Sequence, residues 1–354
     1  MNWEDNVRKV VPYVAGEQPK DQNVIKLNTN ECPYPPAPGV GTAIHDFDCD
    51  ILRKYPDLDV SLLVKALAGH HGLSDKQVFV GVGSDDVLAM AFLTFFNSKK
   101  PVLFPDITYS FYDVWADLYR IPYQCQPLDD NFCIRKEDYF RENGGIVIAN
   151  PNAPTGVAAQ VSELEEIIRA NPDSVVIIDE AYVDFGGGSC VPLIEKYDNL
   201  LVVQTFSKSR SMAGMRIGYA MGNEKMIGCL KDVKFSFNSY TMSAVSIAAG
   251  TAAVADETYF QDTVAKVVTT RERVKGELAK LGFVCTDSKT NFIFASHRTI
   301  PAREIFEALK AENIYVRFWD KPRISDYMRI SIGTDSEMDK VLAFLEHYVN
   351  KRKG

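Results

Sequence analysis

Residues 175–182 read VVIIDEAY and carry the clearest signal of the fold. The run of β-branched residues from Val175 to Ile178 is typical of a strand that is buried on both faces. Strands of this kind belong to parallel sheets covered by helices, and ligands bind beyond the carboxyl ends of such strands. Asp179 follows the run directly, so we expect its carboxylate at that edge of the sheet.

Further short apolar runs on both sides of this stretch alternate with helix-like segments. The helix-like segments cover 85–96, 108–119 and 161–170, the last with Ser162 as its expected N-terminal cap. Alternation of buried strands with helices predicts an α/β fold, a three-layer sandwich built on a mostly parallel sheet. The other expected strands are residues 78–80, 101–104, 146–149, 200–203 and 217–220.

The sequence pattern divides the chain into three parts. Residues 1–40 contain many prolines and form an expected N-terminal arm that partly joins a smaller domain. Residues 41–250 carry the alternating pattern and form the expected large domain. Residues 251–354 form the expected small α+β domain, with helices at 258–281, 302–312 and 335–350 and strands at 291–294 and 329–332.

The composition is that of an ordinary globular protein and argues against several classes. The net charge of −8 disfavours non-specific binding to nucleic acid or to an anionic membrane. The polar N-terminus does not resemble a signal peptide, and no apolar stretch reaches the ~20 residues that a membrane helix needs. Seven scattered cysteines without a C-x-x-C pair fit reduced thiols better than disulfides or a metal site. We therefore expect a cytoplasmic protein without a metal.

A lysine flanked by hydroxyl groups follows one of the expected strands. The segment is Thr205-Phe206-Ser207-Lys208, and Arg216 follows the lysine at a short distance along the chain. Burial and neighbouring positive charge favour a neutral, nucleophilic amine on such a lysine. The hydroxyls of Thr205 and Ser207 and the guanidinium of Arg216 could together hold a phosphate. A surface lysine in a serine-rich loop is the alternative interpretation.

We expect a positively charged partner for the carboxylate of Asp179, because an unpaired charge at a buried strand end costs free energy. A pyridinium nitrogen is such a partner, and this pairing is how proteins tune pyridoxal 5′-phosphate (PLP) as an electron sink. Tyr182, which follows closely in the sequence, could donate to the phenolic oxygen of the same ring. An aspartate that caps a loop and a tyrosine in the core are the alternative.

Two further candidate site segments are loops at strand ends. Residues 81–86 read GVGSDD before a helix, where glycines and free N–H groups suit a phosphate. This is not a dinucleotide-binding fingerprint, and a plain turn explains it equally well. Residues 150–156 read NPNAPTG, a rigid loop that could place one side-chain amide or be an ordinary turn. Each signal is modest alone, but all of them fall at strand ends of one sheet.

These motifs make the chain resemble the fold-type I PLP aminotransferases, and within them the histidinol-phosphate aminotransferases, over nearly its whole length. The strongest matches are DEAY at 179–182, Ser207-Lys208 with Arg216, PTG at 154–156 and RISIGT at 329–334. Matches to the subgroup are PYVAG at 12–16, LNTNE at 27–31, YPD at 55–57 and GSD at 83–85. The resemblance implies the fold of this family and amino transfer between a small amine and a 2-oxo acid.

Carried over position by position, the resemblance implies a cofactor site. Lys208 holds PLP as a Schiff base and moves the proton at the substrate Cα, while Asp179 pairs with the pyridine nitrogen. Tyr182 contacts the phenolic oxygen, and Tyr109 stacks on the ring. Contacts to the cofactor phosphate are implied for Ser84, Asp85, Thr205, Ser207 and Arg216, and for Tyr55 from the other subunit of a homodimer.

The resemblance also implies substrate contacts. Arg329 binds the α-carboxylate of an amino-acid substrate, or the carboxylate of 2-oxoglutarate in the second half-reaction, and Arg317 contacts the distal anion of the substrate. Asn291 lies near the substrate, and Tyr13 could line the same pocket together with Tyr109.

The sequence departs from the family pattern at two positions. The family usually has an asparagine directly before Pro-Thr-Gly, where this chain has Ala153. Asn152 is therefore the expected source of the amide. The glutamate that usually follows Gly-Ser-Asp is Asp86 here, which is a minor change if the backbone holds the phosphate.

Several activities fit these motifs. The substrate pair implied first is histidinol phosphate with 2-oxoglutarate, in histidine biosynthesis. An aromatic amino-acid aminotransferase is the nearest alternative, and a threonine-phosphate decarboxylase shares the fold and similar motifs. A PLP-binding transcription regulator would need a basic DNA-binding domain, and a nicotinamide-dependent dehydrogenase would need the glycine fingerprint followed by an acidic residue.

Overall fold

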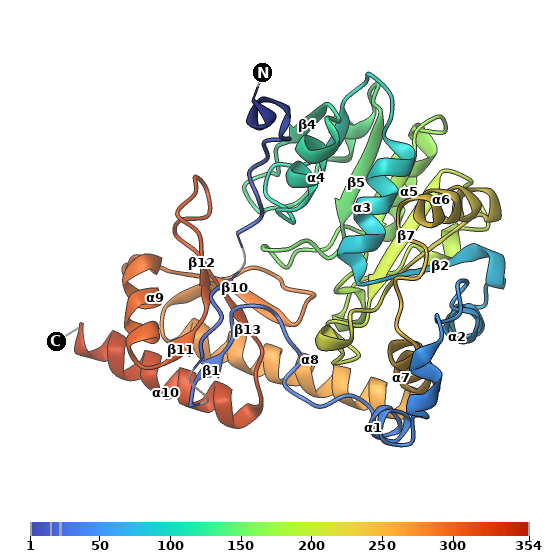
Figure 1. Cartoon of the computed structure of the whole chain (residues 1–354). Helices are drawn as coiled ribbons and strands as arrows, with labels where there is room; N and C mark the ends of the chain where they lie inside the picture. Colours follow the sequence, from blue (N-terminus) through green and yellow to red (C-terminus); the bar gives the residue numbers. More distant parts are fainter. Residues whose placement is uncertain (1, 15, 21–22, 353–354) are drawn as a thin grey trace.

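The computed structural model of the chain describes residues 2–14, 16–20 and 23–352 and has a large sheet-based part and a smaller C-terminal part (Figure 1). The large part is built on a seven-stranded sheet with the order β2-β8-β7-β6-β5-β3-β4. All neighbouring strands are parallel except β8, which runs antiparallel to both β2 and β7. The strands are β2 (Val78–Gly81), β3 (Val102–Pro105), β4 (Tyr123–Gln126), β5 (Gly145–Ala149), β6 (Val176–Asp179), β7 (Leu200–Thr205) and β8 (Gly218–Gly222).

Helices cover both faces of this sheet, because side chains along a strand point alternately to opposite sides. In β6, Val176 and Ile178 pack in one layer and Ile177 in the other. The first layer contains α1 (Pro38–His45), α2 (Ser61–His71), α5 (Val161–Ala170) and α7 (Ala244–Ala255). The second contains α3 (Ser84–Phe95), α4 (Tyr112–Tyr119) and α6 (Glu224–Phe237). The predicted three-layer α/β sandwich with a mostly parallel sheet is confirmed.

Three details of this part differ from the sequence predictions. Helix α4 begins at Tyr112 rather than at 108, because the Asn152 side chain bonds Ile107 and Thr108 and holds them in a turn. The expected cap of α5 at Ser162 is wrong, since Gln160 is the N-cap and Glu163 binds its backbone N–H. Strand β4 reads YQCQ and was missed, because an edge strand with exposed polar side chains has no apolar run.

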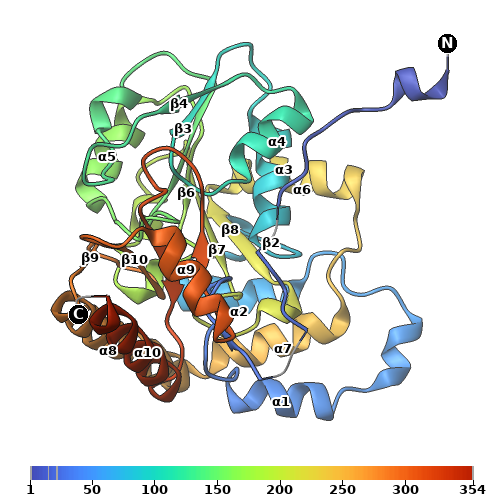
Figure 2. The same ribbon diagram turned by 90° about the vertical axis from the view of Figure 1, so that its left-hand side faces the viewer.

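The C-terminal part contains a four-stranded antiparallel sheet with the order β12-β13-β10-β9. Its helices share one apolar core with this sheet and agree with the helices predicted from the sequence. Figure 2 shows α8 and α10 side by side, with α9 beside them. The elements are β9 (Phe283–Cys285), β10 (Phe292–His297), β12 (Arg317–Phe318), β13 (Met328–Ser331), α8 (Glu257–Lys280), α9 (Ala302–Ala311) and α10 (Asp335–Lys351).

The N-terminal segment joins the C-terminal part through a short parallel pair, β1 (Ile25–Lys26) with β11 (Ile314–Tyr315) (Figure 1). The expected division at residue 250 falls inside α7, and the division into 1–40, 41–250 and 251–354 stays a proposal. No helix within the described ranges is long and apolar enough to cross a membrane.

Candidate active site

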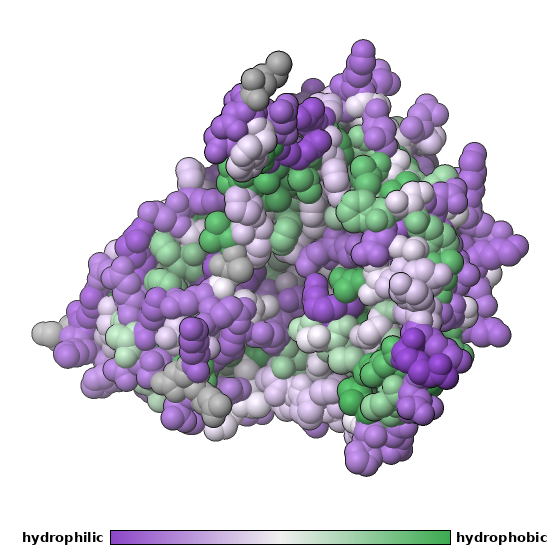
Figure 3. Space-filling view, in the orientation of Figure 1, coloured by the Kyte–Doolittle hydropathy of each residue, from purple (hydrophilic) through white to green (hydrophobic). Residues whose placement is uncertain are grey.

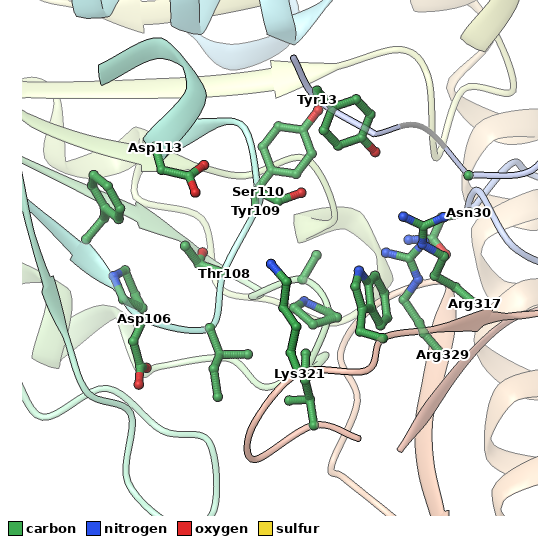
Figure 4. A pocket seen from close by; sticks show the side chains of 18 of the residues that line it. Tyr13, Asn30, Asp106, Thr108, Tyr109, Ser110, Asp113, Arg317, Lys321 and Arg329 are labelled. Atoms are coloured by element: carbon green, nitrogen blue, oxygen red, sulfur yellow. The ribbon is translucent and has the colours of Figure 1, made fainter. Parts of the chain in front are cut away.

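A cavity of about 470 Å³ lies where the carboxyl ends of the parallel strands meet the C-terminal part. Figure 3 shows a hollow in the middle of this face, and Figure 4 shows the side chains around the cavity. Its walls come from the ends of β3, β5, β6 and β7, from the N-terminal segment and from the C-terminal part, which agrees with the rule for ligand sites in parallel sheets. Residues far apart in sequence, among them Thr29, Tyr109, Tyr182, Lys208 and Arg329, line this one space.

Lys208 reaches the cavity from the turn that follows β7. Its Nζ donates a 3.1 Å hydrogen bond to the backbone carbonyl of Thr29 and lies 5.6 Å from the centre of the Tyr182 ring. The carboxylate of Glu31 acts on this amine only through its charge, and the part of the chain that the structure describes contains no salt bridge to Lys208. The amine is therefore held at the cavity wall by a neutral acceptor and faces an aromatic ring.

Asp179 ends β6 and is only 5% exposed. Its carboxylate accepts a 2.8 Å hydrogen bond from the hydroxyl of Tyr112 and a 3.1 Å bond from the backbone N–H of Ala181. Burial raises the pKa of Asp179 to about 6, although these hydrogen bonds and the charge of Lys208 act in the opposite direction. A buried carboxyl with a raised pKa gains most from a cationic partner, and a pyridinium nitrogen is such a partner.

Tyr112 is a residue of this site that sequence reasoning missed. It is the first residue of α4, is fully buried, and donates to Asp179. Burial and the charge of Asp179 raise the pKa of Tyr112 well above its usual value, so it stays a donor. The one general signal for it is that a buried carboxylate such as Asp179 requires hydrogen-bond donors, which does not say where in the sequence the donor lies.

An anion cradle forms where β2 meets α3. Gly83 has a φ of +89° and is followed by Ser84, the first residue of α3, so the unpaired N–H groups of the helix start lie beside it. Arg216 has a φ of +53°, an uncommon value for a residue with a side chain. Its guanidinium lies 3.5 Å from the hydroxyl of Ser207 and 3.3 Å from the carboxylate of Asp85. Helix N–H groups, a hydroxyl and a guanidinium together suit a phosphate.

A Cβ atom could not be added at two glycines of this cradle. At Gly83 it would lie 2.5 Å from Nη2 of Arg216, and at Gly218 it would lie 2.1 Å from the backbone nitrogen of Ser84. The absence of side chains lets β8, the helix start and the arginine approach one another closely.

Thr205 and Tyr109 shape the walls beside the cradle. The hydroxyl of Thr205 accepts a 3.1 Å bond from the backbone N–H of Ser207 and donates to the carbonyl of Ile217. This hydroxyl therefore fixes the turn that carries Ser207. The hydroxyl of Tyr109 donates to Asp85 at 2.7 Å, which holds the tyrosine ring at the cavity wall.

Asn152 does not present its amide to the cavity. Its Nδ2 donates to the carbonyl of Ile107 and to the hydroxyl of Thr155, both at 2.9 Å, and its Oδ1 accepts from Thr108 at 2.8 Å. Both amide hydrogens are used, so the expected donation from Asn152 to a cofactor has no hydrogen left. Ala153 lines the cavity instead. The side chain of Asn152 joins the loop before Tyr109 to the loop after β5.

Two arginines lie together at one end of the cavity, beside Asn30 (Figure 4). Arg329 donates from Nη2 to the carbonyl of Asn28 at 2.9 Å, whereas its Nε is buried without a hydrogen-bond partner. Burial and the charge of Arg317 lower the pKa of Arg329. Asn291 donates to the carbonyl of Asn30 at 2.9 Å, and its Oδ1 is also buried and unpaired. Paired guanidinium groups with an unsatisfied donor are suited to an anion.

Of two tyrosines that the sequence assigns to the site, one lines the cavity and the other lies outside it. Tyr13 lines the cavity and stacks on Phe111, with ring centres 4.2 Å apart. Tyr55 is 82% exposed and stacks on Tyr240 at 4.7 Å, and it does not line the cavity of its own chain. A cofactor contact by Tyr55 would therefore require a second subunit.

The geometry agrees with a comparison against known proteins. A sequence profile of the family described as aminotransferase class I and II matches residues 22–345. This chain belongs to the class I and II aminotransferases. It is 56% identical over 355 residues to a histidinol-phosphate aminotransferase of Lactococcus lactis subsp. cremoris, with 100% of both chains covered. It is 51% identical over 340 residues to the histidinol-phosphate aminotransferase of Clostridium acetobutylicum, which covers 96% of this chain and 97% of the relative.

Solved structures give the same fold for this aminotransferase. The histidinol-phosphate aminotransferase from Sinorhizobium meliloti, in complex with pyridoxal-5′-phosphate, superposes with a TM-score of 0.84 at 26% identity and covers 92% of this chain and 91% of that one. The L-threonine-O-3-phosphate decarboxylase from Porphyromonas gingivalis gives a TM-score of 0.80 at 19% identity, with 92% and 100% covered. The decarboxylase is similar in fold alone.

The cofactor of this aminotransferase is pyridoxal 5′-phosphate, as predicted. The described residues fit it on three counts. A buried carboxyl with a raised pKa suits the ring nitrogen, and the cradle around Gly83 and Arg216 suits the phosphate. The amine of Lys208 lies in the same cavity as both tyrosines that are expected at the ring, Tyr109 and Tyr182.

Proposed function

We propose that this aminotransferase interconverts histidinol phosphate and its ketone, with glutamate and 2-oxoglutarate as the second pair, in histidine biosynthesis. The observation that carries the proposal is the pair Arg317 and Arg329 at one end of a cavity that also contains the Lys208 amine. A guanidinium fork binds a phosphate or a carboxylate equally well. One arginine pair can therefore serve a phosphorylated amine and a dicarboxylic acid in turn, and relatives at 48–56% identity are named for the phosphorylated substrate.

The cofactor supplies an electron-withdrawing cationic ring, and the residues of the chain hold it in place. We assign Asp179 to the ring nitrogen and Tyr182 to the phenolic oxygen. The backbone N–H groups of Ser84 and Asp85, the hydroxyl of Ser207 and the guanidinium of Arg216 hold the phosphate. Tyr109 covers one face of the ring, and Thr205 acts through the turn that it fixes.

Lys208 has two roles in this proposal. Its amine would hold the cofactor through a covalent link that a substrate amine can displace. The released Nζ removes the proton from the substrate Cα and delivers it to the cofactor side, as a positioned general base does. The bond to the neutral carbonyl of Thr29 supports this role, because no carboxylate has to be displaced when the amine moves.

The substrate fills the space between the arginine pair and the aromatic side chains. Arg329 and Arg317, which line the cavity, bind its anionic group, whereas Asn291 is fully buried and holds the backbone carbonyl of Asn30. Tyr13, which stacks on Phe111 at the cavity mouth, covers the ring of the substrate. Aromatic amino acids would use the same walls, so an aromatic amino-acid aminotransferase is the second candidate.

The experiment that tests this function is an absorbance titration of the PLP-loaded protein with single amines. Histidinol phosphate and glutamate should each convert the band of the lysine-linked cofactor into that of the amine form. Phenylalanine at equal concentration should act far more slowly. If phenylalanine reacts faster than histidinol phosphate, the second candidate replaces the first. Threonine phosphate should release no CO₂, and its release would identify a decarboxylase.

We also propose that the enzyme works as a homodimer in the cytoplasm. Exposed apolar side chains gather near α1, α2 and the end of α6, namely Ile44, Ile51, Leu52, Tyr55, Leu62, Phe237 and Tyr240. A second copy covering this surface would bury them and bring Tyr55 to the phosphate of its neighbour. All seven cysteines are unpaired, which supports a reducing compartment.

A further inference from the structure

The phenolic oxygen of the cofactor has fewer donors in this chain than the family pattern provides. Ala153 occupies the position of the usual asparagine, and it lines the cavity with a methyl group. The amide hydrogens of Asn152 are both donated to the scaffold. The hydroxyl of Tyr182 is then the principal donor for this oxygen, and the direction in which its hydrogen points becomes decisive.

The side chain of Asn30 sets that direction. Its Nδ2 donates to the hydroxyl oxygen of Tyr182 at 2.9 Å. A hydroxyl that accepts this bond keeps its own hydrogen for another acceptor. Within the described ranges, the Tyr182 hydroxyl donates to no protein group, and Tyr182 lines the cavity. The hydrogen is therefore available to a ligand in the cavity.

The orientation of the Asn30 amide is itself determined by Ser331. The backbone N–H of Asn30 donates to the Ser331 hydroxyl at 3.0 Å, so that hydroxyl must give its hydrogen elsewhere. The Ser331 hydroxyl donates this hydrogen to Oδ1 of Asn30 at 2.8 Å. Oδ1 is thus the acceptor toward Ser331, and Nδ2 must be the atom that faces Tyr182. In the alternative orientation Nδ2 would donate to the Ser331 hydroxyl, and the hydrogen of that buried hydroxyl would then have no acceptor among the described residues.

The backbone of Asn30 is held as firmly as its side chain. Its carbonyl accepts from Nδ2 of Asn291 at 2.9 Å, and its φ is +57°, in the left-handed region. The side chain is only 1% exposed. Asn291 and Ser331 belong to the C-terminal part and Tyr182 to the large part, so the contact crosses the junction between the two.

We propose that Asn30 is a positioning residue that fixes the Tyr182 hydroxyl as a donor to the phenolic oxygen of the cofactor. This inference rests on the proposed function. It assigns to the LNTNE segment a role in tuning the cofactor, and it explains how the site tolerates alanine at position 153. Hydrogen bonds in a chain strengthen one another, so the donation from Asn30 also makes Tyr182 a stronger donor.

The test is the pH titration of the absorbance of the PLP-loaded protein, which follows the proton on the nitrogen that links Lys208 to the cofactor. A donor at the phenolic oxygen stabilises the form without that proton. Loss of the donation should therefore move the midpoint to higher pH, by about half a pH unit to one unit for one hydrogen bond. The charged groups that act near Tyr182 are Lys208 and Arg329, and neither is changed in the variants; only Asn30→Asp adds a charge of its own.

Two substitutions address Asn30, and one serves as a control. Asn30→Gly removes the side chain and accepts the positive φ, and it should raise the midpoint. Asn30→Asp is close in shape and accepts rather than donates, so it should turn the Tyr182 hydrogen away from the cofactor and raise the midpoint further. Asn313→Gly is the matched control, because Asn313 has a φ of +59° and is exposed, and it should leave the midpoint unchanged.

A double variant decides whether the effect passes through the tyrosine. In a Tyr182→Phe background, Asn30→Gly should add no further shift, since the hydroxyl is already gone. An unchanged midpoint in both Asn30 variants, or full additivity with Tyr182→Phe, would overturn the inference. A wild-type protein without any lysine-linked cofactor band would instead refute the proposed function. If Asn30→Gly fails to fold, Asn30→Asp is compared with and without Tyr182→Phe. The added charge acts in both backgrounds, so a larger shift with the hydroxyl present supports the inference and an equal shift overturns it.

Discussion

The hydroxyl of Tyr112 donates a 2.8 Å hydrogen bond to the carboxylate of Asp179, and both side chains are buried. This pair closes the end of β6 against the start of α4, and the carboxyl group has no cationic side chain bonded to it within the described residues. A ring nitrogen that carries a proton would supply the missing charge. The stability of the protein without cofactor should therefore depend on the protonation of Asp179.

The first prediction concerns that dependence. Burial raises the pKa of Asp179 from 3.8 to about 6, so the folded protein keeps a proton that the unfolded chain releases. The free energy of unfolding of the apoprotein should fall as the pH rises from about 4 to about 6, by on the order of 3 kcal/mol from this group. Asp179→Asn removes this loss, so the variant should be more stable than the wild type at pH 8 without PLP.

Thermal unfolding of both apoproteins at pH 5 and pH 8 checks this prediction. The neighbouring Glu180, whose pKa burial raises to about 7, contributes equally to both proteins, so their difference isolates Asp179. With PLP bound the order should reverse, because asparagine cannot balance a cationic ring. A variant that is less stable than the wild type under every condition would show that Asp179 is an ordinary structural carboxylate.

The second prediction concerns the anion cradle. Gly83→Ala forces a side chain into a φ of +89° and toward the Arg216 guanidinium. The affinity for PLP should fall by at least about 10-fold, since the methyl group displaces the Arg216 guanidinium, and a hydrogen bond to a charged group is worth roughly 1.5–3 kcal/mol. Fluorescence titration of the apoprotein with PLP measures the change. Gly69→Ala in α2 is the control, because a Cβ there meets nothing within 4 Å. Equal PLP affinities in the two variants would show that the cradle around Gly83 does not bind the phosphate.

The third prediction concerns the arginine pair. Arg329→Lys keeps the charge but loses the fork, and Nε of Arg329 is the buried donor that lacks a partner. The kcat/KM for histidinol phosphate and for glutamate should both fall by about 10- to 100-fold, mainly through KM. Arg135→Lys, an exposed pair with Asp138, is the control and should change neither. A loss confined to one of the two substrates would mean that the substrates do not share Arg329.

Much of the fold could be predicted from the sequence because buried parallel strands consist of continuous apolar runs. β5, β6 and β7 follow this rule, and the side chains at their ends meet in one cavity. β4 does not follow it, because it is an exposed edge strand, and β1 and β11 have only two residues each. Short and exposed strands are determined by their partners rather than by their own composition.

The sequence did not reveal every residue of the site, and the reason differs from that for the short strands. The motifs locate Lys208, Asp179 and Arg216, because each of them stands next to a strand or turn with its own sequence signal. Tyr112 and Asn30 are defined by hydrogen bonds to residues far away in sequence, and no local pattern reveals those bonds. Asn152 is the opposite case. Its place in the motif predicts a contact to the cofactor, but its amide hydrogens are donated to Ile107 and Thr155 of the surrounding loops.

The fourth prediction concerns the homodimer. If Tyr55 completes the site of the neighbouring subunit, Lys208→Ala and Tyr55→Ala chains should complement each other. Each mixed dimer would contain one site with both native residues. Unfolding and refolding the two variants together at equal amounts should then restore about a quarter of the wild-type activity, because half of the dimers are mixed. Activity equal to the mean of the two separate variants would place Tyr55 outside the neighbour's site.

Chemical trapping of the bound cofactor shows whether Lys208 carries it. The protein is incubated with PLP, treated with borohydride to make the imine link permanent, and digested for peptide mass spectrometry. The phosphopyridoxyl group should be found on the peptide that contains Lys208 and on no other lysine, and Lys208→Ala should carry none. Label on a different lysine, or equal labelling of the Lys208→Ala variant, would contradict the account.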